Sequence, residues 1–213
     1  AYEIKECDWS SDVCSSDLAS MMRSDFSAIA QWISSGSEVL DVGCGDGSLL
    51  SYLKQTRSAH VYGVELADDK VLACAQKGLN VIQQNLESGL ALFEDKSFDT
   101  VILSQTLQTI HQTERILSEI ARVGKECVVS FPNFGHWSHR LAVLQGRMPV
   151  SKSLPYQWYD TPNVRVLTID DFESLAPEVG LRLLDRVVLH EGEPVSFLPN
   201  LRGSLAIYRA RQA

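Results

Sequence analysis

The stretch VLDVGCGDGSLL, residues 39–50, is the most informative part of this chain. An apolar, β-branched run comes first, glycines follow at Gly43, Gly45 and Gly47, and leucines then recur at helical spacing. This order predicts a strand, a tight turn and a helix. Glycines in such a turn reach positive φ at low cost, and the following helix presents unpaired N–H groups to a ligand. We therefore expect a cofactor-binding loop, with a ligand-free strand-to-helix connection as the alternative.

The spacing of the glycines distinguishes between two kinds of cofactor-binding loop. The dinucleotide fingerprint G-x-G-x-x-G requires a third glycine where Ser48 stands, so the match to NAD binding is incomplete. VLDVGCGDG instead resembles the first motif of class I S-adenosylmethionine (SAM) methyltransferases, which usually has an acid two residues before its first glycine, the place of Asp41. The resemblance implies that Asp41, Gly43, Cys44 and Gly45 contact SAM or S-adenosylhomocysteine (SAH).

Length and composition limit the remaining possibilities. With 213 residues, 45% of them hydrophobic and 22% charged, the chain is predicted to form an α/β domain with a sizeable core. A net charge of −8 argues against a nucleic-acid partner, because such binding depends on lysine and arginine neutralising phosphates. The sequence contains neither an apolar stretch of roughly 18–20 residues nor a secretory signal, so we expect a cytoplasmic protein without membrane contact.

The scattered cysteines lack C-x-x-C spacing, and no metal is expected.

The first residues differ in composition from the rest. KECDWSSDVCSSDL, residues 5–18, is dense in serine and aspartate and has no helical or alternating period. It resembles translated adapter or vector sequence, and a disordered native tail is the alternative. We therefore expect residues 1–20 to be non-native or disordered and residues 21–213 to form a single SAM-binding, methyltransferase-like domain.

Strand and helix patterns alternate along most of the chain. Strands are expected at 39–42, 60–66, 81–82, 98–104 and 126–131. Helices are expected at 24–33, after the glycine loop, and at two places where Asp68 and Thr113 are the predicted N-caps. A capping-box-like start at Thr168 and two strands at 181–190 and 204–210 follow. This alternation predicts a Rossmann-like, doubly wound, mostly parallel sheet. The methyltransferase resemblance implies that the C-terminal strand is antiparallel.

Several candidate cofactor residues stand at strand ends, where open α/β sheets bind ligands. Glu65 ends the second strand and is predicted to accept the ribose hydroxyls, unless it is simply an exposed strand-end glutamate. By resemblance, Asn85 takes the place of the aspartate that usually accepts the adenine amino group, and Leu86 packs on the adenine face, with a plain core leucine as the alternative. Ser104 and Gln105, just past the fourth strand, are expected to border the methionine half, with simple loop polarity as the alternative.

A catalytic residue is not identified. Methyl transfer from a sulfonium depends mainly on proximity and alignment, and a base is needed only for protonated acceptors. His111, after the fourth strand, and His136, after the fifth, are the candidate bases. A structural or solvated role is the alternative for each.

The segment 132–167 is rich in aromatic residues and has no clear predicted structure, which is typical of a lid or contact surface. VSFPNFGHW, GRMP and LPYQWYDTPNVRVLT, with LDVGCGDG and QTLQ, resemble the MetW family of methionine biosynthesis proteins from about Met22 onward. The resemblance implies a SAM-binding partner that activates a MetX-type homoserine O-acyltransferase. We expect Trp137, Tyr156, Trp158 and Tyr159 to form the partner or substrate surface. An autonomous SAM-dependent methyltransferase acting on a small molecule is the alternative.

Overall fold

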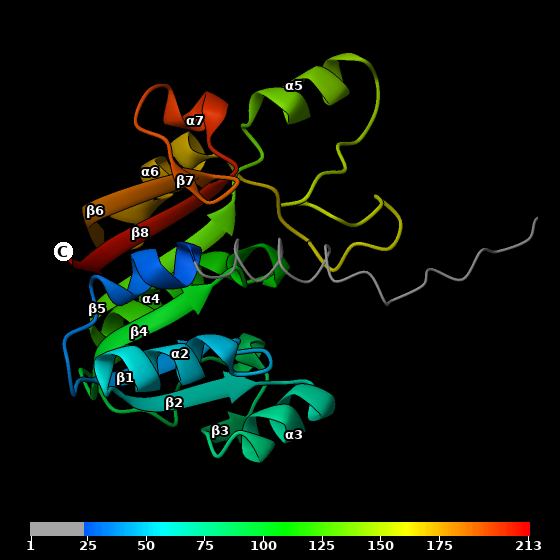
Figure 1. The fold of residues 1–213 in the computed structure, drawn as a ribbon. Helices are drawn as coiled ribbons and strands as arrows, with labels where there is room; N and C mark the ends of the chain where they lie inside the picture. The colour runs from blue at the N-terminus through cyan, green and yellow to red at the C-terminus, as the bar shows by residue number, and fades with distance from the viewer. Residues whose placement is uncertain (1–23) are drawn as a thin grey trace, which may run out of the picture.

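The computed structural model describes residues 24–213, and the predicted tail at 1–20 lies outside the described residues (Figure 1). The strands are β1 (Glu38–Val42), β2 (His60–Glu65), β3 (Asn80–Gln83), β4 (Phe98–Ser104), β5 (Gly124–Pro132), β6 (Leu181–His190), β7 (Glu193–Pro194) and β8 (Leu205–Gln212). The helices are α2 (Ser48–Arg57), α3 (Asp68–Gln76), α4 (Thr113–Val123), α5 (Trp137–Leu144), α6 (Ile169–Glu178) and α7 (Pro199–Arg202). Residues 24–30 are also helical, and two short 3-10 helices are η1 (Leu86–Ser88) and η2 (Leu107–Thr109).

These strands form one mixed sheet in the order β3-β2-β1-β4-β5-β8-β6-β7. β1 to β5 are parallel, and β8 inserts antiparallel between β5 and β6. The prediction of a mostly parallel sheet with an antiparallel C-terminal strand is therefore confirmed. The strand order reverses between β1 and β4, so the crevice beyond the ends of these strands is the expected ligand position.

Helices cover both faces of the twisted sheet (Figure 1). One apolar cluster joins the sheet to α4 and α6 through buried side chains such as Ile116, Ile120 and Phe172. A second cluster joins the opposite face to residues 24–33 and to α2, where Leu50 and Leu53 are fully buried. The helical spacing seen in the sequence therefore marks the faces that are buried.

Two of the predicted helix caps are wrong. The N-cap residues of α3 and α4 are Ala67 and Gln112, and neither uses a side-chain cap, so Asp68 and Thr113 are the first helical residues. The predicted capping box of α6 is confirmed: the Thr168 hydroxyl accepts from the Asp171 backbone N–H, and the Asp171 carboxylate accepts from the Thr168 N–H. Of these three predicted caps, only Thr168 is followed three residues later by an acid, Asp171, as the capping box requires.

The segment 132–167 is more ordered than the sequence predicted. It contains α5, followed by an irregular run with one isolated bridge between Ser151 and Leu154. The segment extends on the side toward which the arrowheads of the parallel strands point (Figure 1). Asn133 is fully buried and holds its two ends together, because the Asn133 Oδ1 atom accepts from the backbone N–H groups of Gly135 and Ile169.

Candidate functional site

The glycine loop joins β1 to α2 in the conformation expected from its composition. Gly43, Gly45 and Gly47 have φ values of 80°, 54° and 75°, a region that favours glycine. The backbone N–H groups of Gly43 and Cys44 both donate to the carbonyl oxygen of Val64, at 2.8 and 3.1 Å. These bonds fix the loop against the end of β2.

A cleft of about 520 Å³ opens beside this loop, within the range of roughly 300–1,000 Å³ that is usual for small-molecule sites. Six of the predicted site residues line it: Gly43, Glu65, Asn85, Leu86, Gln105 and His111. The other lining residues, which the predicted set did not include, are Leu66, Ala67, Glu87, Thr106, Thr109 and Ile110. All lie within six residues after the end of β2, β3 or β4, so extending the search that far beyond each strand end would have found them.

Glu65 organises the cleft. Its Oε2 atom accepts from the Gly45 N–H at 2.8 Å, and its Oε1 atom accepts from the N–H groups of Leu66 and Ala67 at 2.7 and 3.0 Å. A carboxylate offers roughly four lone-pair positions, so these three donors leave capacity for a ligand hydroxyl. Glu65 thus both supports the glycine loop and remains able to bind.

Asn85 also lines the cleft and follows β3. Its Oδ1 atom accepts from the Glu87 N–H at 2.9 Å and caps η1, whose first residue is Leu86. An amide oxygen has a second lone pair, and the Asn85 side chain can therefore cap the helix and still accept from a ligand.

Four other predicted cofactor residues do not line the cleft. Asp41 is 2% exposed and lies beneath the loop, and Cys44 is also buried. Gly45 is tied to Glu65, and the Ser104 hydroxyl lies 3.2 Å from that of Ser130. Direct contact with a ligand stays a prediction for each of them.

Burial gives Asp41 an unusual acidity. Its Oδ1 atom has no hydrogen-bond partner in the described part of the chain, and desolvation, with a smaller contribution from Glu65, raises the pKa of Asp41 from 3.8 to about 7. The folded protein therefore retains this proton over a pH range in which the unfolded chain has released it. Asp41 stabilises the fold least above pH 7.

We expect the Asp41→Asn variant to gain stability relative to the wild type as pH rises. Between pH 5 and pH 8 the difference in free energy of unfolding should move by about 2–3 kcal/mol in favour of the variant, since asparagine does not ionise. Urea denaturation across this range measures it. Asp99→Asn is the control: a hydrogen bond from Lys125 lowers the pKa of Asp99, so this carboxylate is ionised in both the folded and the unfolded chain throughout this range and its difference should not change with pH. A difference for Asp41→Asn that does not change with pH would contradict the assignment.

The two candidate bases occupy different places. His111 lies at the rim of the cleft, where its backbone N–H donates to the Glu87 carboxylate at 2.6 Å. His136 is buried in a histidine cluster at the start of α5, with its ring stacked on His190 at 4.7 Å between centroids. Burial, then the neighbouring His190 and His139, lower the pKa of His136 to about 4. The structure thus brings only His111 to the cleft.

The four predicted contact residues are exposed on the segment 132–167. Trp158 and Tyr159 are 72% and 70% exposed and meet edge to face, with ring centroids 5.6 Å apart. Trp137 begins α5 and Tyr156 lies in the irregular run, each about half exposed. Further exposed apolar side chains of the same segment are Leu141, Val143, Leu144, Met148, Val150, Val164 and Val166. Exposed apolar side chains gathered on one segment are typical of interaction surfaces, and a contact role for these residues stays a prediction.

Among residues 24–213, no helix combines the length and the apolar composition that a membrane span needs. Nor does the range contain three or more histidine, cysteine, aspartate or glutamate residues arranged to hold a metal ion.

The sequence model of the family described as methionine biosynthesis protein MetW matches residues 23–210. The chain belongs to the MetW family. The bifunctional methionine biosynthesis protein MetXA/MetW of Rhodopirellula baltica is 36% identical over 173 residues, which are 76% of this MetW-family chain and 28% of the relative. A fatty-acid O-methyltransferase of Mycolicibacterium smegmatis is 34% identical over 102 residues, or 46% of this chain and 36% of that enzyme. The MetW-family chain therefore spans well under half the length of these relatives.

Solved structures agree with the fold of this MetW-family chain. A SAM-dependent methyltransferase from Archaeoglobus fulgidus superimposes with a TM-score of 0.71 at 16% identity, covering 92% of this chain and 94% of that one. Magnesium protoporphyrin IX methyltransferase from Synechocystis, solved with bound SAH, gives 0.66 at 18% identity and covers 100% and 91%. The chain has the class I SAM methyltransferase fold.

Proposed function

We propose that this chain binds SAM or SAH in the cleft beside the glycine loop. We further propose that it acts in methionine biosynthesis as the partner and activator of a MetX-type homoserine O-acyltransferase. The observation that carries the partnership is the 36% identical relative, which is named for both MetXA and MetW. A protein that unites two functions in one chain is a common sign that the separate proteins associate.

The residues of the cleft fit the cofactor. The adenosine ribose presents two neighbouring hydroxyls, and the Glu65 carboxylate retains acceptor capacity for such a group. The free lone pair of the Asn85 amide suits the adenine amino group, and Leu86 offers an apolar surface to the base. When bound, SAM supplies an electrophilic methyl group, whereas SAH does not. A regulatory role requires no methyl transfer, so either ligand is compatible with it.

Replacing Glu65 tests the cofactor assignment. We expect Glu65→Ala to weaken SAM binding by tenfold or more, because losing a hydrogen bond to a charged group costs about 1.5–3 kcal/mol. Calorimetric titration with SAM, SAH and NAD measures the effect, and NAD should not bind. Glu94→Ala, an exposed glutamate outside the cleft, is the matched control. Unchanged SAM affinity, or tighter binding of NAD, would refute the assignment.

The exposed segment 132–167 supports the partner half of the proposal. Aromatic residues at the centre of an interface typically contribute most of its binding energy, and Trp158 and Tyr159 are among the most exposed large side chains of the chain. They lie outside the cleft lining, so partner and cofactor can bind at the same time.

Mixing this chain with a MetX-type acyltransferase tests the partnership. We expect the two to elute together in size-exclusion chromatography and the rate of homoserine acylation to rise when this chain is added. Separate elution with an unchanged acylation rate would exclude the proposal.

An autonomous methyltransferase is the second candidate. The 34% identity to a fatty-acid O-methyltransferase over 102 residues favours it, as does the position of His111 at the rim of the cleft. His111 would then remove a proton from an acceptor hydroxyl. Transfer of a labelled methyl group from SAM to a small molecule, lost in His111→Gln, would support this candidate.

A further inference from the structure

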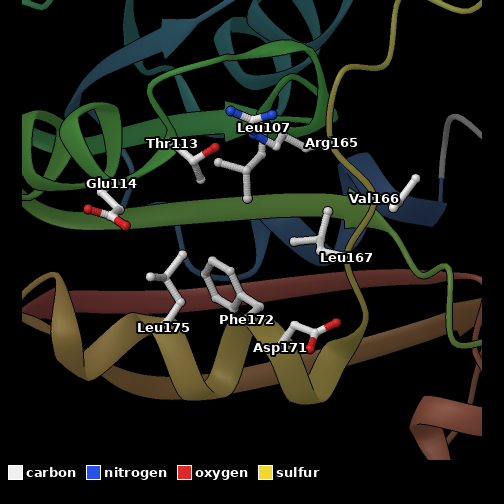
Figure 2. A pocket seen from close by; sticks show the side chains of 9 residues that line it. All are labelled: Leu107, Thr113, Glu114, Arg165, Val166, Leu167, Asp171, Phe172 and Leu175. Atoms are coloured by element: carbon white, nitrogen blue, oxygen red, sulfur yellow. The ribbon is translucent and has the colours of Figure 1, made fainter.

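A separate cavity of about 220 Å³ lies between α4 and α6, on the face of the sheet that these two helices cover (Figure 2). The segment 165–167 crosses one end of it. The lining residues are Leu107, Thr113, Glu114, Arg165, Val166, Leu167, Asp171, Phe172 and Leu175. None of them lines the SAM cleft.

The floor of this cavity is apolar. Leu107 and Phe172 are each 1% exposed, and Leu167 and Leu175 are half-buried beside them. In Figure 2 Phe172 and Leu175 rise from α6, with Leu107 above them. Water in such a space is poorly satisfied, so an apolar group of a ligand would replace it favourably.

Three charged side chains line the cavity, Arg165, Glu114 and Asp171, and the Asp171 carboxylate is already occupied by the capping box of α6. Arg165 and Glu114 have opposite charges and also line an adjoining cavity of about 330 Å³. The Arg165 guanidinium donates only to backbone carbonyls, to His111 at 2.8 Å and to Val164 at 3.3 Å. Within residues 24–213, neither Arg165 nor the Glu114 carboxylate forms an ion pair. The His111 contact holds the guanidinium in place and leaves donors for an anion.

We propose that this cavity binds a small α-amino acid with an apolar side chain. The ligand carboxylate would pair with Arg165, its ammonium group with Glu114, and its side chain would cover Leu107 and Phe172. The size agrees, because a cavity of about 220 Å³ lies just below the roughly 300–1,000 Å³ that is usual for drug-sized ligands and suits a small molecule. The carboxylate of a fatty acid would pair with Arg165, but a fatty acid has no positive group to pair with Glu114. A zwitterion has both charges and therefore fits better.

Calorimetric titration of the full chain tests the proposal, with methionine and norleucine as probes. Both should bind, whereas N-acetylmethionine, without the ammonium group, and methionine methyl ester, without the carboxylate, should bind at least threefold more weakly. Hexanoate, a carboxylate without an ammonium group, tests whether the site accepts any carboxylate. If hexanoate binds as tightly as methionine, the assignment of a zwitterion is wrong.

Variants locate the site. Arg165→Gln and Glu114→Gln should each weaken methionine binding three- to tenfold, and Val166→Trp at the exposed rim should abolish it by filling the cavity. Arg211→Gln and Glu178→Gln, exposed charges elsewhere, are controls. The Glu114 side chain forms no ion pair within residues 24–213, so Glu114→Gln should leave the fold intact. The SAM affinity of this variant should be unchanged, which distinguishes this site from the proposed cofactor cleft. No binding of either probe at 10-fold molar excess over millimolar protein, or equal binding by all variants, would refute the proposal.

Discussion

Gly43→Ala is expected to lower the free energy of unfolding by about 3–5 kcal/mol and to abolish SAM binding. Gly43 has a φ of 80°, and a β-carbon there would lie 2.6 Å from Cγ2 and 2.7 Å from Oγ1 of Thr106. Thr106 is β-branched, and its short side chain cannot swing away without moving the backbone after β4. Because that backbone forms one wall of the cleft, the substitution should damage the fold and the site together.

Gly45→Ala is the matched control in the same loop. Gly45 also has positive φ, but nothing lies within 4 Å of the position of its β-carbon, so only backbone strain of about 1–2 kcal/mol is expected. Combining Gly43→Ala with Thr106→Gly should restore part of the lost stability, since the clash is removed. Urea denaturation of the wild type and these three variants measures the effects. Equal losses for Gly43→Ala and Gly45→Ala would show that the contact with Thr106 has no energetic role.

The fold was predictable because burial follows the sequence pattern closely in the sheet. β4 spans 98–104 as expected, since the run FDTVILS is buried along almost its whole length between two helical layers. The antiparallel position of β8 had a different source: periodicity identifies a strand, but only the family resemblance gave its direction. Its insertion between β5 and β6 depends on contacts between residues far apart in the chain.

α5 could not be predicted from burial, because it has almost none. His139 is its only buried residue, and apolar side chains such as Leu141 and Leu144 face outward. Its start is also unusual: the Nδ1 atom of His136 accepts from the Ser138 N–H, so a histidine takes the place of the usual Ser, Thr, Asp or Asn cap. A helix without a buried face or a common cap lacks both signals on which sequence patterns depend.

The candidate site was partly predictable for a related reason. Glu65 and Asn85 stand directly at strand ends, which the topology places at the crevice. Thr106 also lines it, but its position depends on the turn after β4, where Gln105 adopts a φ of 48° and its side chain donates to Asp25. Asp25 is 80 residues away in sequence, and no local pattern links the two.

Replacing Trp158 and Tyr159 together by alanine is expected to weaken association with the MetX-type acyltransferase by about 100-fold or more. Each large aromatic ring buried at the centre of an interface contributes about 2 kcal/mol, and a tenfold change in affinity corresponds to about 1.4 kcal/mol. Both side chains are more than two-thirds exposed in this chain, so thermal stability should hardly change. SAM binding should also persist, because neither residue lines the cleft.

Surface plasmon resonance with the immobilised acyltransferase measures this loss. Leu92→Ala is the control, since Leu92 is 69% exposed but lies between η1 and β4, outside the segment 132–167. If the segment instead encloses a methyl acceptor, the double variant would keep its affinity for the acyltransferase and lose transfer of a labelled methyl group. That pair of results would favour the enzyme over the partner, because the same aromatic surface would then bind a small molecule rather than a protein.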